Sequence, residues 1–423
     1  MTFQGKKIIY VTREIERALG VVPSRDYLII SNRTTYGESA QKQYPDFITL
    51  IEPIDDKVLG TTELLNHPTT RSIISKAQEE LSDSGEKIQV SILVFKNTLR
   101  VEAATQGNGW NILNPKSSLS EKVENKISQI RWLNELGQKY LPSHVTKIVK
   151  SIVWKNDPFI IQWSHGHTGD GTILVKTREQ LASIQEKFPE RMARLSAFVQ
   201  GASYTVNSVV TSDKILVGNI SYQITGLAPF TENEFSTIGN DWGLASTLLN
   251  EQDKQNIQNI AREVGQKLQT DGWRGLFGID VIKQNSNGRI HLIEVNARQP
   301  ASTTFESHLQ EETRRKGRPG LTSFEAHLRS LLGLPIDQEL IEINDGAQIV
   351  QRVTKSIQGV FDDVGDTIKK AGYDVIIYQN TEYNSDLIRI QSPVSIMENH
   401  GVFNLKGREI LSKIKDSQFK IEI

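Results

Sequence analysis

Two carboxylates interrupt apolar runs about two thirds of the way along the chain. Asp280 lies in the run 278–282 (GIDVI), and Glu294 lies in the run 293–298 (IEVNAR). The turn sequence at 285–288 (NSNG) between the two runs predicts adjacent antiparallel strands. Because an unpaired buried carboxylate is costly, a cation or a cationic side chain has to face both acids. The pattern therefore predicts a sheet that carries a charged cleft.

The residue types around these acids are typical of a magnesium site. Glu294 and Asn296 are two positions apart, so on a strand they point to the same face. With Asp280 they supply two carboxylates and an amide oxygen, which are hard ligands suited to Mg²⁺. Arg298 continues that face, and its fork of donors suits a phosphate oxygen. An ordinary carboxylate–arginine pair at a strand end is the alternative.

A glycine-bearing hairpin loop at 164–172 is the second chemical feature. Gly166, Gly169 and Gly171 permit close approach of the backbone, and successive N–H groups in such a loop can cradle phosphate oxygens. The loop is not a P-loop, because no Gly-Lys-Ser/Thr follows and a strand comes after it. Taken alone the signal is weak, because a glycine-rich hairpin is more often only a turn.

The rest of the chain predicts an α/β protein. Short buried strands at 7–11, 26–31 and 88–95 alternate with helices such as 69–81, which favours a parallel sheet over roughly the first 110 residues. Further predicted elements are helices at 120–141 and 252–270 and strands at 158–163, 173–175, 195–199, 204–211, 277–283, 290–295, 375–378 and 387–391.

Composition excludes several classes of function. The chain has 49 basic and 50 acidic residues, a formal net charge of -1, which argues against a nucleic-acid or anionic-membrane partner. It has no cysteine, which excludes disulfides, thiolate metal sites and cysteine nucleophiles. No apolar stretch approaches the roughly 20 residues of a membrane span. We expect a cytoplasmic protein.

An ordered set of motifs carries a family resemblance. Asn125-Lys126 precedes an apolar helix, the glycine hairpin follows, and then come Asp280 and Glu294-x-Asn296-x-Arg298. Over about residues 116–310 this set resembles the ATP-grasp superfamily. The resemblance implies an α/β, ATP-grasp fold with three parts. These are an N-terminal parallel-sheet (pre-ATP-grasp) domain at 1–115, a core at 116–335 with a lid subdomain at about 145–215, and a small C-terminal α+β domain at 336–423.

The resemblance also implies a reaction. In this superfamily ATP binds with two Mg²⁺ ions, for which Mn²⁺ can substitute, and a substrate carboxylate takes the γ-phosphoryl group to form an acyl phosphate that an amine or thiol then displaces. By this resemblance Asp280, Glu294 and Asn296 hold the metal ions, and Arg298 is catalytic. The nucleotide-binding positions it implies are Lys126, Gln162, Gly166, Thr168, Gly169, Gly171, Gln200 and Ser203.

Two departures from the family pattern concern the grip on the nucleotide. Gln162 stands where the family usually has a second phosphate-binding lysine, so either Lys155 or another cation compensates, or ATP binds more weakly. The strand-to-strand hinge has no Asp or Glu, and Ser203 stands at the position of the ribose-binding carboxylate. The amides of Gln200 and Asn207 are the candidates to replace it.

Finer features resemble the pheganomycin-type peptide ligases, namely the segments 239–242 and 167–172 and the appended C-terminal domain. We therefore predict amide or peptide bond formation from amino-acid or peptide substrates, in peptide or secondary-metabolite biosynthesis. One alternative acceptor is the thiol of an acyl carrier protein. The other alternative is a non-catalytic, ATP-binding regulatory protein. The oligomeric state stays open, a homodimer being common among the relatives.

Overall fold

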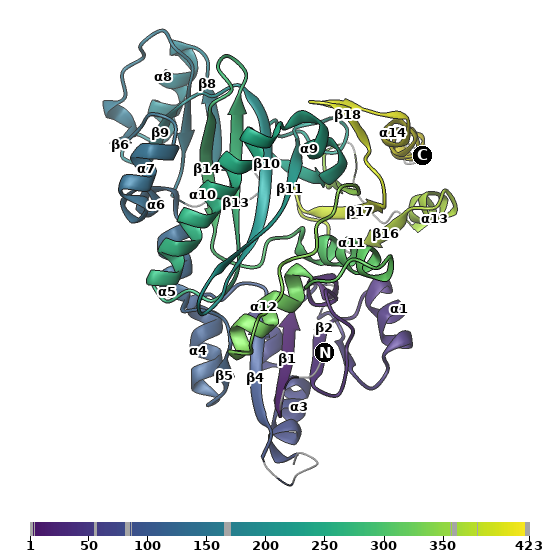
Figure 1. The fold of residues 1–423 in the computed structure, drawn as a ribbon. Coiled ribbons are helices and arrows are strands. Elements are labelled where there is room, and N and C mark those ends of the chain that lie inside the picture. The colour runs from purple at the N-terminus through teal and green to yellow at the C-terminus, as the bar shows by residue number, and fades with distance from the viewer. Residues whose placement is uncertain are drawn as a thin grey trace.

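The computed structural model describes residues 3, 5–54, 57–80, 85, 87–164, 171–355, 357, 362–378 and 380–418. The N-terminal part is a five-stranded parallel sheet in the order β3-β2-β1-β4-β5, at the bottom of Figure 1. Its strands are β1 (Lys6–Thr12), β2 (Tyr27–Asn32), β3 (Ile48–Ile51), β4 (Gln89–Val94) and β5 (Asn111–Ile112). Its helices are η1 (Ile15–Ala18), α1 (Thr35–Gln43), α2 (Thr61–Asn66), α3 (Pro68–Glu79) and α4 (Leu99–Gly107). The predicted parallel-sheet α/β class is confirmed.

The single helix predicted at 120–141 was wrong. Three short helices replace it, α5 (Ser117–Glu124), α6 (Lys126–Leu133) and α7 (Glu135–Tyr140). The cause is local: the side chain of Asn125 accepts hydrogen bonds from the backbone N–H groups of Ile127 and Ser128, which caps a new helix. Asn134 has a positive φ of 51°, which ends that helix. The break places Lys126 at a helix N-terminus.

A four-stranded antiparallel sheet, called here the lid sheet, stands apart at the upper left of Figure 1. Its strand order is β6-β9-β7-β8, and it has a small apolar core of its own around Ile161 and Trp163. Its elements are β6 (His144–Ile148), η2 (Val149–Ser151), β7 (Phe159–Gln162), β8 (Thr172–Val175), α8 (Arg178–Lys187) and β9 (Met192–Ala197).

The central sheet has eight strands in the order β14-β13-β10-β11-β12-β15-β17-β16. Its strands are β10 (Gly201–Val210), β11 (Ile215–Thr225), β12 (Thr237–Asp241), β13 (Gly275–Gln284), β14 (Ile290–Asn296), β15 (Ala347–Arg352), β16 (Asp374–Ile377) and β17 (Asp386–Ser392). The strands beyond residue 336 thus extend the same sheet, because β15 pairs with β12. The predicted domain boundaries stay predictions.

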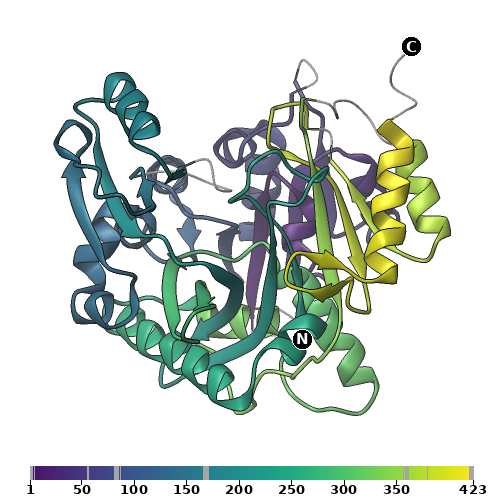
Figure 2. The ribbon, with the colours of Figure 1, turned by 90° about the horizontal axis from the view of Figure 1, so that it is seen from above.

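Helices and a small hairpin complete the fold. They are α9 (Trp242–Leu248), α10 (Glu251–Thr270), α11 (Thr303–Arg315), α12 (Ser323–Leu332), α13 (Asp362–Lys370), β18 (Met397–Asn399), β19 (Val402–Phe403) and α14 (Leu405–Gln418). The predicted helix at 252–270 is confirmed as α10, which Asn250 opens with a capping box. The lid sheet and α14 lie at opposite ends of the molecule (Figure 2).

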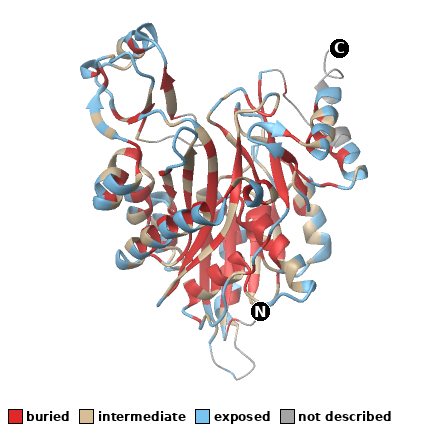
Figure 3. Cartoon of the chain, turned by 45° about the horizontal axis from the view of Figure 1, so that its top comes forward, coloured by how far each residue is buried: buried red, intermediate tan, exposed pale blue. Residues whose placement is uncertain are grey.

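Apolar burial joins the central sheet to the C-terminal part. One cluster of buried side chains runs from Val123 and Trp132 through the central strands to Ile410 and Ile414. Figure 3 shows these strands as the most continuously buried part of the chain. None of the helices in the described residues is long and apolar enough to cross a membrane.

Candidate active site

Asp280 and Glu294 lie directly opposite each other on the antiparallel pair β13 and β14. Asn296 is two positions further along β14, and its Nδ2 donates to Oδ2 of Asp280 at 3.1 Å. A β-bulge directly after Asp280 shifts the register of the pair. The structure therefore brings together the three side chains that the sequence suggests as metal ligands.

Asp280 has only uncharged hydrogen-bond partners among the described residues. Its Oδ1 accepts from Oγ1 of Thr205 and from Nε2 of Gln223, each at 2.7 Å, and Asn296 completes the set. Burial, together with the negative charge of Glu294, raises the pKa of Asp280 from about 3.8 to about 6. Two carboxylates held this close favour a bound cation.

Glu294 faces the first residue of α6. Its Oε1 forms an ion pair with Nζ of Lys126, whose side chain is 7% exposed against 28% for Glu294. The backbone N–H of Lys126 donates to the carbonyl of Ser164 at 3.1 Å, where the predicted phosphate loop begins. Lys126 therefore connects the carboxylate pair to the lid sheet.

Arg298, two positions after the end of β14, is held by Glu124, whose side chain is 8% exposed. Its Nη1 donates to Oε1 of Glu124 at 2.6 Å, and the same carboxylate pairs with Lys96. Burial alone raises the pKa of Glu124, but the charges of Arg298 and Lys96 outweigh it and lower that pKa. Sequence reasoning missed Lys96 and Glu124. The available signal was that Lys96 follows the predicted strand 88–95, at the carboxyl edge of a parallel sheet, where ligands commonly bind.

The hairpin positions are described only at their base. Gly166, Thr168 and Gly169 lie outside the described residues, whereas the carbonyl of Gly171 accepts from the N–H of Trp163 at 2.9 Å. Gln162 is the last residue of β7, is buried, and its Nε2 lies 3.4 Å from Oγ1 of Thr172. The two strands that flank the loop pair as the sequence predicts.

The hinge residues differ in their surroundings. Ser203 is two positions from Thr205 on β10, so it shares the face that carries the Asp280 contacts. The side chain of Gln200 is exposed, and its carbonyl accepts from the N–H of Asn285. Asn207 donates to Glu306 and to Ser302, so its amide is engaged inside the core.

The donor set fits magnesium better than a transition metal. Within the described ranges no group of three His, Cys, Asp or Glu side chains is placed to hold a metal ion. Two carboxylates and one amide are what the cluster offers. Mg²⁺ commonly binds through one or two carboxylates and completes its shell with water and phosphate oxygens.

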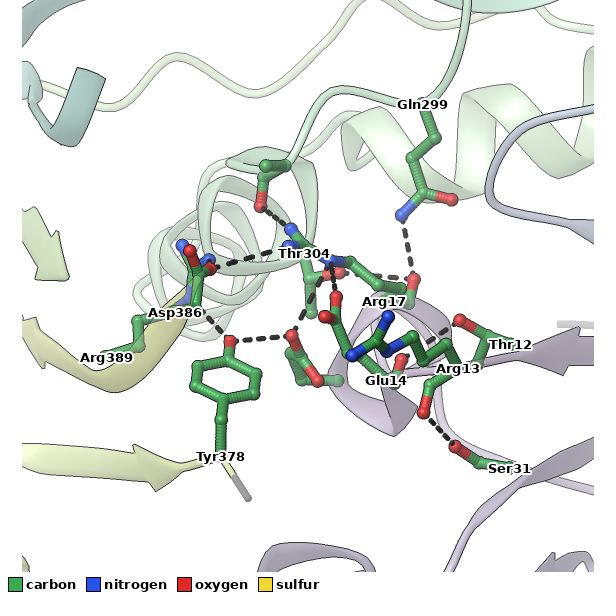
Figure 4. Close-up of polar contacts among 12 residues, drawn as sticks. Thr12, Arg13, Glu14, Arg17, Ser31, Gln299, Thr304, Tyr378, Asp386 and Arg389 are labelled. Atoms are coloured by element: carbon green, nitrogen blue, oxygen red, sulfur yellow. Dashed lines mark hydrogen bonds and ion pairs between the residues drawn. The ribbon is translucent and has the colours of Figure 1, made fainter. Parts of the chain in front are cut away.

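A second polar cluster lies where the N-terminal sheet meets the C-terminal strands (Figure 4). The hydroxyl of Tyr378 donates to Glu16 at 2.7 Å and accepts from Nε of Arg389 at 2.9 Å. Asp386 pairs with Arg389 at 2.9 Å and with Arg352 at 2.5 Å. Burial alone raises the pKa of Asp386, but the arginines outweigh it and lower that pKa. Because the carboxylate of Asp386 has two arginine partners, we interpret this cluster as a structural joint.

Comparison with known proteins identifies the fold to which this site belongs. Residues 123–302 match a family described as the ATP-grasp domain. No curated protein sequence matches the chain. The fold is similar to the ADP complex of N5-carboxyaminoimidazole synthetase from Staphylococcus aureus, with a TM-score of 0.62, 11% identity, and coverage of 99% of this chain and 98% of that one.

Two further structures show the same likeness. One is carboxyaminoimidazole ribonucleotide synthase from Aspergillus clavatus complexed with ATP, with a TM-score of 0.61, 14% identity and 100% coverage of both chains. The other is L-amino acid ligase from Bacillus licheniformis, with a TM-score of 0.58, 14% identity, and coverage of 98% and 97%. Residues 123–302 thus form an ATP-grasp domain, and the chain as a whole has the ATP-grasp fold.

Proposed function

We propose that this protein is an ATP- and Mg²⁺-dependent ligase that activates a carboxylate as an acyl phosphate and joins it to an amine. The observation that carries the proposal is the pair Asp280 and Glu294, which face each other on the ATP-grasp sheet, with no cation among the hydrogen-bond partners of Asp280 in the described residues. Lys126 and Arg298 flank the pair, so carboxylates for a metal and cations for phosphates meet at one place.

The acidic and basic residues of the site have different proposed roles. Asp280, Glu294 and Asn296 would hold Mg²⁺, which when bound neutralises charge on the ATP phosphates. Lys126 can exchange its ion pair with Glu294 for phosphate oxygens once the metal occupies that carboxylate. Arg298, which Glu124 fixes in position, would stabilise the charge that develops on the transferred phosphoryl group. The hairpin around Gly171 would close over the phosphates and exclude water, which protects an acyl phosphate from hydrolysis.

The carboxylate substrate is proposed to bind beside Arg298, at the carboxyl edge of the N-terminal sheet. A small pocket there is lined by Lys96, Asn97, Arg298 and Gln299 among others. β1 and β4 are neighbours in that sheet, and the chain order reverses between them, which is where open α/β sheets bind ligands. Lys96 and Arg298 supply positive charge on either side of Glu124, which suits a carboxylate substrate.

For the substrates we propose an amino acid or short peptide as carboxylate and an amine as acceptor. The amino-acid ligase among the similar structures supports this class. The cation pair beside the pocket supports a carboxylate rather than a neutral ligand.

The test is release of ADP and phosphate from ATP and Mg²⁺ across a panel of amino acids, dipeptides and an acyl carrier protein, with bicarbonate plus 5-aminoimidazole ribonucleotide as a further pair. Release that requires one carboxylate and one amine is the expected result. Release only with the carrier protein would replace the amine by a thiol. ATP binding without release on any pair would contradict the ligase.

A further inference from the structure

A buried arginine of the lid sheet has no carboxylate partner. Arg194 on β9 is 1% exposed. Its Nε donates to Oγ of Ser196 at 3.1 Å and its Nη1 to Oε1 of Gln129 at 3.4 Å, both uncharged groups. Among the described residues, no carboxylate oxygen lies within 4.0 Å of a guanidinium nitrogen of Arg194, so Arg194 has no ion pair there. A buried charge without a counter-ion is costly, so the position favours an anionic ligand.

The strand register places this guanidinium on the side of the lid sheet where the phosphate loop begins. Arg194 pairs directly with Gln162, and Gln162 pairs directly with Thr172. Directly opposite residues share a face of the sheet, so all three side chains lie on one face. Gln162 and Thr172 also flank the base of the glycine hairpin, from its two strands.

A second set of contacts connects Arg194 to the carboxylate pair. Gln129, which accepts from Arg194, lies on α6, one turn after Lys126. The Nε2 of Gln129 reaches the carbonyl of Val295 at 3.5 Å, between Glu294 and Asn296. Burial lowers the pKa of Arg194 to about 10, against an opposing effect of the Glu294 charge, so Arg194 is cationic at neutral pH.

The other cations of the site already have acidic partners. Lys126 pairs with Glu294, and Arg298 pairs with Glu124. Gln162 is neutral, and Lys155, the compensating cation considered from the sequence, is exposed. Arg194 is therefore the buried cation here that lacks a counter-ion within the described part of the chain.

We propose that Arg194 binds the β- or γ-phosphate oxygens of ATP and supplies, from the neighbouring strand, the positive charge that Gln162 lacks. The proposal rests on the proposed function, since it assumes a nucleotide at this site. By this proposal the lid sheet contributes positive charge to the nucleotide through β9. An arginine fork can grip two phosphate oxygens at once.

The test is calorimetric titration of the full chain, in Mg²⁺, with ATP, ADP and adenosine. Wild type is compared with Arg194→Gln and with the double variant Arg194→Gln/Gln162→Lys. Loss of one charge-assisted phosphate contact is expected to weaken ATP and ADP binding about tenfold or more and to leave adenosine within about twofold. The double variant restores the charge at the neighbouring position and is expected to regain most of the ATP affinity.

Some outcomes would contradict the role of Arg194 while leaving the proposed ligase function intact. Unchanged ATP affinity in Arg194→Gln, with ATP binding by wild type, removes the role of Arg194 and keeps the ATP site. Equal weakening of ATP and adenosine reassigns Arg194 to packing. If wild type does not bind ATP, both this proposal and the proposed function fail.

A second variant covers the case in which Arg194→Gln does not fold. Arg194→Lys keeps the charge with a shorter reach, and we expect a loss of ATP affinity of about two- to tenfold with adenosine unchanged. An unchanged ATP affinity, or an equal loss for adenosine, contradicts the proposal.

Discussion

Asp280 and Asp386 are two partly buried acids of one protein whose pKa values are shifted in opposite directions. Asp386, in the joint shown in Figure 4, contacts Arg352 and Arg389, and its pKa is lowered. Asp280 contacts only hydroxyl and amide groups in the described structure, and burial together with Glu294 raises its pKa to about 6.

The comparison separates two kinds of buried charge. Where the protein supplies the counter-charge, as around Asp386, the cluster stabilises the fold. Where it leaves the charge uncompensated, as at Asp280, folding has left a cost that a ligand can remove. The same distinction separates Arg389, which has a carboxylate partner, from Arg194, which has none in the described chain.

The largest effect is expected from variants that remove a carboxylate of the Asp280–Glu294 pair. We expect Glu294→Gln or Asp280→Asn to lower ADP formation by about 10³-fold or more, because metal and phosphate charge is then no longer matched. The melting temperature of Asp280→Asn is expected to stay close to that of wild type, since this variant removes one of two repelling charges, whereas Glu294→Gln also leaves Lys126 without its ion-pair partner and is expected to lower it. Glu263→Gln, which changes an acid of a partly exposed pair with Lys139, is the matched control. Near-native turnover of the Glu294 or Asp280 variant would remove the metal assignment.

The next largest effect is expected from a variant that removes the carboxylate of Asp386 from its cluster with Arg352 and Arg389. Asp386→Asn leaves Arg352 and Arg389 without their carboxylate, and we expect a loss of about 3–5 kcal/mol in the free energy of unfolding. Urea denaturation measures it, and ADP formation per folded molecule should stay near that of wild type. A stability loss below about 1 kcal/mol would show that the joint is not structural.

A variant of Arg298 tests whether this cation acts in the transition state or in binding of ATP. We expect Arg298→Ala to lower kcat about 10²-fold while the Kd for ATP changes about threefold or less, because the charge it meets develops in the transition state. Steady-state kinetics and ATP titration measure the two quantities. An equal loss in both would make Arg298 a ground-state binding residue.

Glu306 lies outside both clusters and tests whether a buried acid without a cationic partner lowers stability. It accepts from the side chains of Asn207 and Asn219 and contacts no cation in the described structure, and burial raises its pKa to about 7. Because the folded-state pKa lies above the unfolded one, its contribution to stability is fully present below about pH 4 and is lost as pH rises through 7.

We therefore expect Glu306→Gln to gain about 2 kcal/mol relative to wild type between pH 5 and pH 8. Urea denaturation of both proteins at the two pH values measures the gain. A difference in unfolding free energy that does not change with pH would contradict the assigned shift.

Local patterns predicted much of the fold and part of the site. The alternation of strands and helices predicted the parallel sheet, and the turn sequence at 285–288 predicted the pairing of β13 with β14. The length of one helix was misjudged, because periodicity continues across Asn125 while the Asn125 side chain caps a new helix. A polar residue inside an amphipathic pattern can thus hide a break.

The parts that were not predicted depend on distant pairing. Arg194 lies beside Gln162 only because β9 pairs with β7, and it meets Gln129 across 65 positions. Tyr378 reaches Glu16 across 362 positions. The extension of the central sheet by β15 depends on its pairing with β12, which no local signal marks. Strand existence is a local property, whereas strand neighbours are not.

The central claim is that Asp280, which has no cationic hydrogen-bond partner in the described structure, and Glu294, which pairs with Lys126, together hold the metal that ATP needs. The most direct measurement is ATP titration with and without Mg²⁺ for wild type and Glu294→Gln. We predict that Mg²⁺ strengthens ATP binding to wild type by about tenfold or more and has little effect on the variant. The same Mg²⁺ dependence in both proteins would contradict the account.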